Sequence, residues 1–422
     1  MRNSSVENLQ NVDLVIIGGG CAGMSAAISA HKNGIRDILI LERSSYLGGV
    51  LKQCIHNGFG IHRFGQDLTG SEYAKRYTDE IDRLGISFLT DTFVLSLTQD
   101  HDITAISPAG GILRIRAKAV ILAMGCRERP RGALTIPGTR PAGIFSAGTA
   151  QRYLNLEGYI VGKKIVILGS GDIGLIMARE FAIEGSEVLA VAEIMPYSSG
   201  LIRNIVQCLE DFHIPLYYNT TVTRIEGTER VTGVWLSQVD ASRKPVPGTE
   251  RFVACDTLVL SVGLIPENEL CSEAGIELSS DTGGAVVDDS FQTSVPGVFA
   301  CGNALHVHDL VDFVSMESEV AGERAAQFIR GKSDTASVVR AEPGFGVMAL
   351  VPQRVRLTGA EDRIKFQFRP RQRFENAEIR ITSDGCRISS VKKRVLTPGE
   401  MCELSLERSS IHSDLKVEVI GL

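Results

Sequence analysis

A unit of strand, glycine turn, helix and strand occurs twice in this 422-residue chain, and it constrains the fold more than any other feature. Residues 12–17 are apolar and β-branched, and they lead into a turn that holds Gly18, Gly20 and Gly23. A helical stretch then leads to a second apolar run, which ends at Glu42. Short strands that alternate with helices predict parallel sheets covered by helices, so we expect an α/β protein.

Residues 164–193 repeat this pattern. Their glycines are Gly169, Gly171 and Gly174, and their second strand ends at Glu193. In both units the first glycine and the acidic residue lie 24 positions apart, and the two units are offset by 151 positions. The equal spacing argues against the alternative that each match is only a glycine-rich turn of some other α/β protein.

The chemistry of this unit is dinucleotide binding. Its glycines let backbone N–H groups and a helix N-terminus approach a pyrophosphate, and its acidic residue accepts hydrogen bonds from a ribose. Two units predict two dinucleotides, and FAD with NAD(H) is the pair that supports hydride transfer. Glu193 would repel a 2′-phosphate, and residues 191–196 contain no Lys or Arg, so we expect NADH rather than NADPH. The alternative is that Glu193 is a solvated strand end.

The composition excludes several other classes of protein. Hydrophobic residues make up 44% of the chain and its net charge is −6, which excludes a disordered or collagen-like chain and gives no sign of nucleic-acid binding. The nine cysteines include no C-x-x-C pair, so a zinc site of that type is not expected. The first residues are polar, and no run of about 18 apolar residues occurs, so we expect no membrane span and a reducing, cytoplasmic location.

In the last part of the chain, the hydrophobic residues change from the spacing of a helix to the alternation of a strand. A helical pattern ends near Ile329, and residues 331–340 are small and polar, as in a linker. Segments 364–368 and 378–381 alternate apolar and polar residues, and Asp384-Gly385 predicts a hairpin turn. Residues 331–422 carry 16 Lys and Arg residues against 12 Asp and Glu residues, a net charge of +4. We therefore expect a small, mostly β domain over 341–422.

The order of these motifs resembles a known superfamily. The two fingerprints are accompanied by Gly48-Gly49, by Gly125 after an apolar strand, by Val262-Gly263 with Pro266, and by a strand that ends in Cys301-Gly302. The match, over about residues 12–330, is to the pyridine nucleotide-disulfide oxidoreductases, which include glutathione and thioredoxin reductases. This resemblance implies two Rossmann-like domains. An NAD(H) domain over 141–264 would be inserted into an FAD domain made of 1–140 and 265–330.

Four longer segments resemble one subgroup more closely. They begin at Gly49, Ser199, Cys301 and Val391. This subgroup contains FAD-dependent subunits found beside glycerol-3-phosphate dehydrogenase-like proteins, and it is related to subunits of opine oxidase, hydrogen cyanide synthase and dye-linked proline dehydrogenases. The resemblance implies electron exchange between NAD(H), FAD and a partner flavoprotein or iron–sulfur subunit, in an oligomer or hetero-complex. The cofactor-binding residues would be Gly18, Gly20, Gly23, Glu42, Gly49, Gly125, Gly169, Gly171, Gly174, Glu193, Gly263, Gly302 and Asn303.

Two positions depart from the superfamily pattern. The disulfide reductases carry a cysteine pair beside the flavin, whereas this chain has only Cys54 after Gly49. Cys54 is either a single redox thiol or a buried packing thiol. The superfamily also has an aspartate after the glycine of its last strand, which holds a flavin ribityl hydroxyl, and here Asn303 replaces it. An amide can still bind a hydroxyl, so FAD binding is still expected.

Histidines supply the other catalytic candidates. His56 follows Cys54, and His306 and His308 lie where the resemblance implies a helix start that faces the flavin pyrimidine ring. A histidine there would add charge or relay a proton, and the alternative is a structural histidine bonded to the backbone. The H-x-H spacing also suggests a metal, but the sequence marks no third ligand, so we expect none.

Three functions are consistent with these residues. The first is hydride transfer between NADH and FAD with electrons passed to a partner protein, and the basic run 363–373 is either a docking site for an acidic partner or a solvated strand face. The second is a self-contained NADH oxidase or a peroxide or thiol reductase that uses Cys54. The third is a structural or regulatory subunit that binds nucleotides without turnover.

Overall fold

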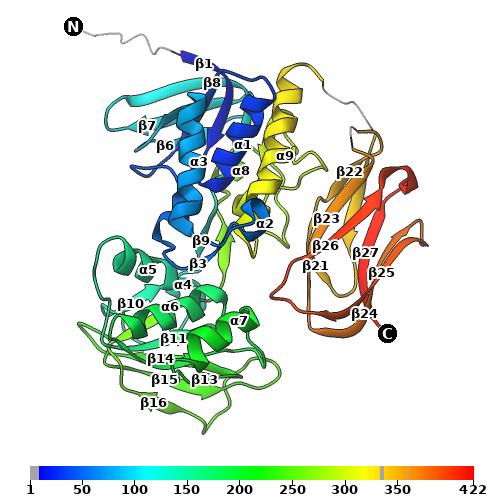
Figure 1. Cartoon of the computed structure of the whole chain (residues 1–422). Coiled ribbons are helices and arrows are strands. Elements are labelled where there is room, and N and C mark those ends of the chain that lie inside the picture. Colours follow the sequence, from blue (N-terminus) through cyan, green and yellow to red (C-terminus); the bar gives the residue numbers. More distant parts are fainter. Residues whose placement is uncertain (1–8, 333–336, 360) are drawn as a thin grey trace. The chain divides into compact units, whose positions relative to one another are not determined.

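The computed structural model describes residues 9–332, 337–359 and 361–422 (Figure 1). The polar residues 1–8 and part of the expected linker, 333–336, lie outside the described residues. The chain divides into two units, of which unit 1 combines Met1–Cys126 with Pro266–Leu422 and unit 2 is Arg127–Ile265. Among the described residues, no helix has the length and apolar character needed to cross a membrane.

A seven-stranded sheet forms the centre of unit 1. Its order is β5-β2-β1-β8-β7-β6, and β19 pairs with β8 beside this path. Strands β1, β2, β5, β8 and β19 are parallel, while β6 and β7 are antiparallel. The bounds are β1 Leu9–Ile17, β2 Ile38–Leu41, β5 Ser87–Leu89, β6 Phe93–Leu97, β7 Asp102–Ser107, β8 Gly111–Leu122 and β19 Val298–Ala300.

Both faces of this sheet are covered, as expected for parallel strands with continuous apolar sequence. Leu14 and Ile16 of β1 belong to the core under the helices, whereas Val15 and Ile17 belong to the core on the opposite face. The long helices of the first core, grouped together in Figure 1, are α1 Cys21–Lys32, α3 Gly70–Leu84 and α9 Val311–Ile329. The short elements of this unit are η1 Gly49–Gln53, β3 Asn57–Phe59, α2 Ile61–Phe64, β4 Leu68–Thr69, α8 Glu269–Glu273 and η3 Gly302–Ala304.

Unit 2 repeats the architecture on a smaller scale. Five parallel strands have the order β10-β17-β11-β12-β13, and a three-stranded antiparallel sheet, β14-β15-β16, is built beside them. The strands are β10 Ile144–Ser146, β11 Lys164–Leu168, β12 Glu187–Ala192, β13 Leu216–Tyr217, β14 Thr220–Glu226, β15 Gly233–Gln238, β16 Arg251–Val253 and β17 Thr257–Leu260. The helices are α4 Arg131–Leu134, α5 Ala147–Asn155, α6 Asp172–Ile183, α7 Ile202–Ile205 and η2 Val206–Glu210, and the short strands β9 Cys126–Glu128 and β18 Leu264–Pro266 pair with each other.

The C-terminal strands have a hydrophobic core of their own. They form a five-stranded sheet, β22-β20-β27-β24-β25, and a three-stranded sheet, β21-β23-β26. Asp384 and Gly385 make the predicted two-residue turn between β24 and β25, since Ser383 pairs with Cys386. The bounds are β20 Val338–Pro343, β21 Val347–Val351, β22 Arg354–Arg356, β23 Arg363–Pro370, β24 Phe374–Ser383, β25 Cys386–Leu396, β26 Cys402–Glu407, η4 Arg408–Ser410 and β27 Leu415–Gly421.

The predicted α/β class with two Rossmann-like sheets and a mostly β C-terminal region is confirmed. The unit boundaries differ from the expected ones. Unit 2 begins at Arg127, 14 residues before the expected start at 141, because residues before 141 also join it: Gly138 forms a bridge with Ile225. The C-terminal strands, expected as a domain of their own, are part of unit 1 because ion pairs and hydrogen bonds tie them to residues 287–290 and 307–309.

Candidate functional site

The turn between β1 and α1 leaves a cradle for an anion. Gly18 has φ +109°, and a Cβ there would lie 2.3 Å from the Ala123 carbonyl oxygen, so this position requires glycine. A Cβ on Gly23 would lie 1.9 Å from the Gly18 carbonyl oxygen, whereas Gly20 faces open space. The first turn of α1 has no side-chain cap and no acidic residue. No acidic side chain there would repel a bound anion, which suits a pyrophosphate.

Glu42 connects this cradle to the second strand. It is buried, and one carboxylate oxygen accepts a 2.7 Å hydrogen bond from the Gly19 N–H. The other oxygen accepts a 2.7 Å bond from the Ser44 N–H. A carboxylate has about four acceptor positions, so two are left for the hydroxyls of a ribose.

Unit 2 holds the same arrangement at the same offset. Gly169 has φ +101°, and a Cβ there would lie 2.0 Å from the Ser261 carbonyl oxygen. Glu193 is buried and accepts bonds from the N–H groups of Ser170, at 2.9 Å, and Met195, at 2.9 Å. Ser170 and Met195 occupy the positions in unit 2 that Gly19 and Ser44 occupy in unit 1. The Ser170 hydroxyl adds a third bond, at 2.6 Å, which leaves Glu193 fewer open acceptor positions than Glu42 has.

The residues present fit a dinucleotide in both cradles. The space in front of Gly171 is also open, since the nearest atom to an added Cβ is Ser199 Oγ at 3.6 Å, and Gly174 packs α6 against Gly169. One difference is Asp172 in the first turn of α6. Its Oδ1 accepts bonds from the Leu201 N–H and the Asn204 amide, at 2.8 and 2.7 Å, so part of its acceptor capacity is satisfied within the protein.

Three further predicted glycines belong to unit 1. A Cβ on Gly49 would approach Gly20 Cα to 3.1 Å, and one on Gly302 would approach Ala22 Cβ to 2.9 Å. Both therefore lie against the N-terminal turn of α1. Gly125 accepts a hydrogen bond from the Glu267 N–H and has open space at its Cα. Gly263 lies in unit 2, where its carbonyl accepts a bond from the Arg129 N–H.

Cys54 and His56 lie after η1 and do not join the other candidate histidines. The Cys54 side chain is buried, and its thiol donates to the Val50 carbonyl oxygen at 3.4 Å. His56 Nδ1 lies 3.0 Å from the Asn57 carbonyl oxygen, and its ring packs on Phe59 with centroids 5.1 Å apart. These contacts are local, so they describe packing at this loop and leave the redox use of Cys54 as a prediction.

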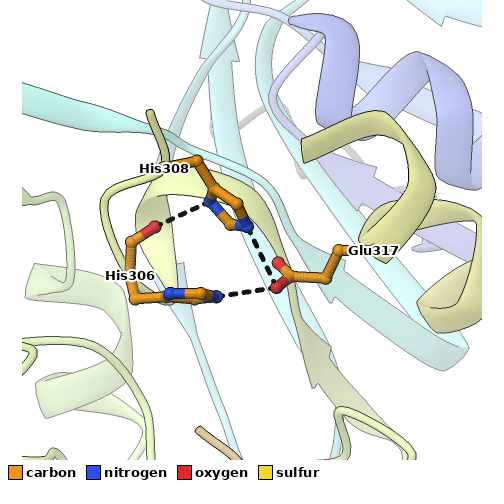
Figure 2. A group of neighbouring side chains, drawn as sticks. All are labelled: His306, His308 and Glu317. Carbon is orange, nitrogen blue, oxygen red and sulfur yellow. Dashed lines mark hydrogen bonds and ion pairs between the residues drawn. The ribbon is translucent and has the colours of Figure 1, made fainter. Parts of the chain in front are cut away.

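His306 and His308 meet a residue that the motifs do not mark, Glu317 (Figure 2). His306 Nε2 lies 2.7 Å from Glu317 Oε2, and His308 Nε2 lies 3.2 Å from the same oxygen. The other carboxylate oxygen accepts a 2.7 Å bond from the Gly302 N–H. All three side chains are at most 3% exposed. We refer to His306, His308 and Glu317 as the histidine–glutamate cluster.

Burial and charge act against each other in this cluster. Burial by itself would raise the pKa of Glu317, but the two histidines bonded to it hold that pKa well below its usual range. Burial lowers the pKa of His306, and the nearby His308 lowers it further. Glu317 is therefore an anion and His306 is neutral near pH 7.

The two histidines lie in a loop before α9 and not at the expected helix start. Leu310 is extended, and α9 begins only at Val311. Asn303 stabilises this loop, because its side-chain oxygen accepts a 3.0 Å bond from the His308 N–H and its amide donates to Cys126 Sγ at 3.6 Å. The predicted role of Asn303 toward a ribityl hydroxyl stays a prediction.

The loop lies at the cradle end of unit 1. The Ser25 hydroxyl of α1 donates to the Ser315 carbonyl of α9, and the Ser29 hydroxyl donates to the Glu319 carbonyl. Both helices advance by four residues between these bonds, so they run parallel and their N-termini lie at the same end. This places the histidine–glutamate cluster beside the first turn of α1, where Gly302 contacts Ala22.

Sequence reasoning missed Glu317, although a signal was present. On α9 it is in a stripe with Val314 and Ala321, spaced three and four residues, which predicts a buried position. A carboxylate in such a stripe requires a partner. It also supplies the third ligand-type side chain beside H-x-H that the sequence did not mark, and the ligand atoms lie within 4.8 Å of one another.

The cysteines offer no paired thiol for disulfide exchange. None of the nine forms a disulfide in the described part of the chain, and six are buried. Unit 2 holds only Cys208 and Cys255, in cores on opposite faces of its sheet, and burial raises the pKa of each to about 11. Near the cradle of unit 1, burial raises the pKa of Cys21 and of Cys301 to about 12. These four thiols are therefore poor nucleophiles near neutral pH.

The five cations of the basic run 363–373 all meet acidic partners. Arg363 and Lys365 pair with Glu407 and Glu403 across the sheet, at 3.2 and 2.8 Å. The other three pairs are Arg369 with Asp309, Arg371 with Asp281, and Arg373 with Glu375. This neutralisation supports the interpretation of the run as a strand face with its charges satisfied.

Comparison with known proteins agrees with this architecture. Residues 12–340 match the family described as pyridine nucleotide-disulphide oxidoreductase. The chain is 26% identical over 331 residues to the F component of alkyl hydroperoxide reductase from Staphylococcus aureus, covering 76% of this chain and 59% of that protein. It is 24% identical over 340 residues to an opine oxidase subunit of Agrobacterium tumefaciens, covering 74% and 64%. The chain thus spans about three fifths of the length of these relatives.

Among solved structures, thioredoxin reductase of T. acidophilum is similar over 77% of this chain and 100% of its own, with a TM-score of 0.62 and 26% identity. The match over residues 12–340 confirms the superfamily resemblance expected over 12–330. The opine oxidase relative belongs to the group of proteins that the closer resemblance indicated.

Proposed function

The chain belongs to the pyridine nucleotide-disulphide oxidoreductase family, whose enzymes use FAD and a nicotinamide dinucleotide, and on this premise we propose that it transfers a hydride between NADH and FAD and exchanges electrons with a separate redox protein. When bound, the two cofactors would supply the hydride chemistry. The cradle of unit 1 would hold FAD and that of unit 2 would hold NAD(H). The observation that carries this proposal is the duplicated bridge from acid to glycine turn, Glu42 to Gly19 and Glu193 to Ser170.

The partner would be a second flavoprotein or an iron–sulfur subunit, such as a glycerol-3-phosphate or amino-acid dehydrogenase-like protein. Two observations support exit of electrons to a partner. The relative from Agrobacterium tumefaciens is named as one subunit of an oxidase, and the thiols of this chain form no disulfide. A reducing compartment, the cytoplasm, suits nine cysteines without a disulfide and is part of the proposal.

Anaerobic reduction of the FAD-loaded protein tests the hydride step. Addition of NADH is expected to bleach the flavin absorbance near about 450 nm, and NADPH is expected to act at least about tenfold more slowly in kcat/KM, because Glu193 would oppose a 2′-phosphate. The Glu193→Gln variant should reduce the ratio of kcat/KM for NADH to kcat/KM for NADPH. No bleaching by either nucleotide would instead support a binding subunit without turnover.

The route by which electrons leave is tested by reoxidation in air. The proposal expects slow reoxidation by oxygen, rapid reoxidation by a one-electron dye, and no change in Cys54→Ser. Cys386→Ser is the matched control, since that thiol is exposed in the C-terminal sheets. The match to a component of alkyl hydroperoxide reductase supports one alternative, a peroxide or thiol reductase. Rapid reoxidation in air that Cys54→Ser abolishes would establish this alternative.

A further inference from the structure

His308 faces one more hydrogen-bond acceptor than a neutral imidazole can satisfy. Its Nδ1 lies 3.0 Å from the His306 carbonyl oxygen, and its Nε2 lies 3.2 Å from Glu317 Oε2. Both neighbours are acceptors, and a neutral ring has a single N–H. An imidazolium satisfies both contacts and places a positive charge beside the buried carboxylate.

His306 has the opposite deficit. Its Nε2–H donates to Glu317 Oε2, so its Nδ1 is an acceptor. That nitrogen is buried and has no hydrogen-bond partner among the described residues. The cluster therefore contains one anion, one cation and one vacant proton acceptor, and it lies at the cradle end of unit 1.

We propose that the histidine–glutamate cluster is a proton-holding site for the flavin, in which both ring nitrogens of His308 donate to fixed acceptors and His306 takes up one proton at Nδ1 when the flavin gains two electrons. This inference rests on the proposed function and deepens it. NADH would supply one hydride, which carries both electrons to the flavin, and the separate proton that His306 takes up comes from solvent and returns to solvent when the electrons leave. His306 changes from neutral to cationic, which balances one unit of the negative charge gained by the flavin.

The titratable and charged groups packed around the cluster have partners within the protein or stay protonated. On the strand and helix sides, the Cys301 and Cys21 thiols stay protonated, because burial raises the pKa of each to about 12. The carboxylate of Asp312, in the first turn of α9, is bonded to the N–H groups of Gly60 and His62. From the C-terminal sheets, Arg369 pairs with Asp309, so that cation is neutralised beside the cluster.

A metal ion explains the contacts less well. Two ligands bound at about 2.0–2.1 Å around a tetrahedral ion lie roughly 3.3 Å apart. His306 Nε2 and Glu317 Oε2 are only 2.7 Å apart, a normal charge-assisted hydrogen bond. Both histidines also point at one carboxylate oxygen and not at a shared central position (Figure 2).

The first test reads the protonation of His308 in the oxidised, FAD-loaded protein. Histidine rings are labelled with ¹⁵N, and spectra are recorded near about pH 8, where an ordinary histidine is neutral. The expected result is two protonated ring nitrogens for one histidine, absent in His308→Gln. Should that variant fail to fold, single Gln variants at the other seven histidines make the assignment by elimination. A neutral His308 would overturn the proposal.

The second test counts protons taken up during photochemical reduction without nicotinamide, in weak buffer with an indicator dye. Wild type is expected to take up one more proton per FAD than His306→Gln, and the control His412→Gln, at an exposed position, should match wild type. An equal count in His306→Gln, or one bound divalent metal per chain that His306→Gln loses, would overturn the proposal. Because no nicotinamide is used, failure here is distinct from failure of NADH to bleach the flavin.

Discussion

At the residue scale, Glu317 is the side chain on which the candidate site of unit 1 converges. It receives hydrogen bonds from the Gly302 backbone and from His306 and His308. The loop that carries the histidines is thereby tied to the helix behind it. Neither histidine would have a defined orientation from the sequence alone, because its partner lies nine or eleven residues further along the chain.

Acid should destabilise the protein through this cluster. The folded-state pKa of His306 is lowered, so the unfolded chain binds that proton first and stability falls as pH drops below about 6.5. The lowered pKa of Glu317 adds a second loss below about pH 4.5. Urea unfolding at pH values of about 7.5, 6.5 and 5.5 measures the first loss. Relative to His306→Gln, wild type should lose stability as the pH falls across this range, and an identical pH dependence in the two proteins would refute this assignment.

Substitution of the first glycine in each cradle should show which cradle binds which cofactor. Gly18→Ala combines a positive φ with a 2.3 Å approach to a carbonyl oxygen, and we expect a loss of about 3 kcal/mol or more together with loss of FAD. Gly169→Ala has the same defect in unit 2, so its protein should keep FAD but lose bleaching by NADH. Gly85→Ala is the matched control, with φ +63° and no atom within 4 Å, and should cost about 1 kcal/mol. Measurements are FAD content, urea unfolding and bleaching.

At the scale of elements, the parallel packing of α1 and α9 positions the site. Their backbones approach so closely that a Cβ on Gly322 would lie 2.2 Å from the Ala26 carbonyl oxygen. Two serine hydroxyls of α1 bond to carbonyls of α9 and set the register. Residues 290 positions apart are thereby held together, so the nucleotide turn and the histidine loop share one end.

Separating these helices should loosen the flavin site. Gly322→Ala is expected to cost about 1–3 kcal/mol and to increase the rate of FAD release, because the added methyl group forces the helices apart. Met316→Ala, at an exposed position on the same helix, should change stability by less than about 0.5 kcal/mol. Thermal unfolding and flavin fluorescence on release measure both effects. A Gly322→Ala protein that releases FAD as slowly as Met316→Ala would contradict this view of the helix pair.

At the scale of the whole molecule, the C-terminal strands are joined to the rest of unit 1 by buried charges. The Arg408 side chain lies in a pocket of oxygens: its guanidinium donates to the Glu361 and Arg356 carbonyls and, at 2.8 Å, to Asp289. Asp289 also pairs with Arg356, at 3.3 Å. The strands therefore depend on residues of the dinucleotide-binding part for charge compensation, although their hydrophobic core is their own.

Removal of this buried arginine should destabilise the chain. Arg408→Ala is expected to cost about 3 kcal/mol, since it leaves the buried Asp289 carboxylate with one cation. Arg373→Ala removes a solvent-exposed pair with Glu375 and should cost less than about 1 kcal/mol. Urea unfolding of the full chain, followed by flavin and by tryptophan fluorescence, compares the two. Similar losses in both variants would show that the Asp289 contact is not the important one.

The sequence by itself determined the two nucleotide-binding units, their order and their chemistry. These features are local, because a glycine turn, its helix and the acid at the end of the next strand lie within about 25–30 residues and follow from the backbone geometry of the turn. The mostly β character of the C-terminal region could also be predicted from the sequence, since strand alternation and the Asp384-Gly385 turn are local signals.

The tertiary structure decided what lies beside the first cradle. Glu317, the Gly302 contact with Ala22 and the shared end of α1 and α9 depend on the packing of segments that are far apart along the chain, 290 residues in the pair of Ser25 with Ser315. It also decided between the two interpretations of the basic run, a docking site or a solvated strand face. The acids that neutralise its cations lie up to 90 residues away, as in the pair of Arg371 with Asp281. Hydrogen bonds and ion pairs act over a few ångströms, and only folding brings distant residues within that range.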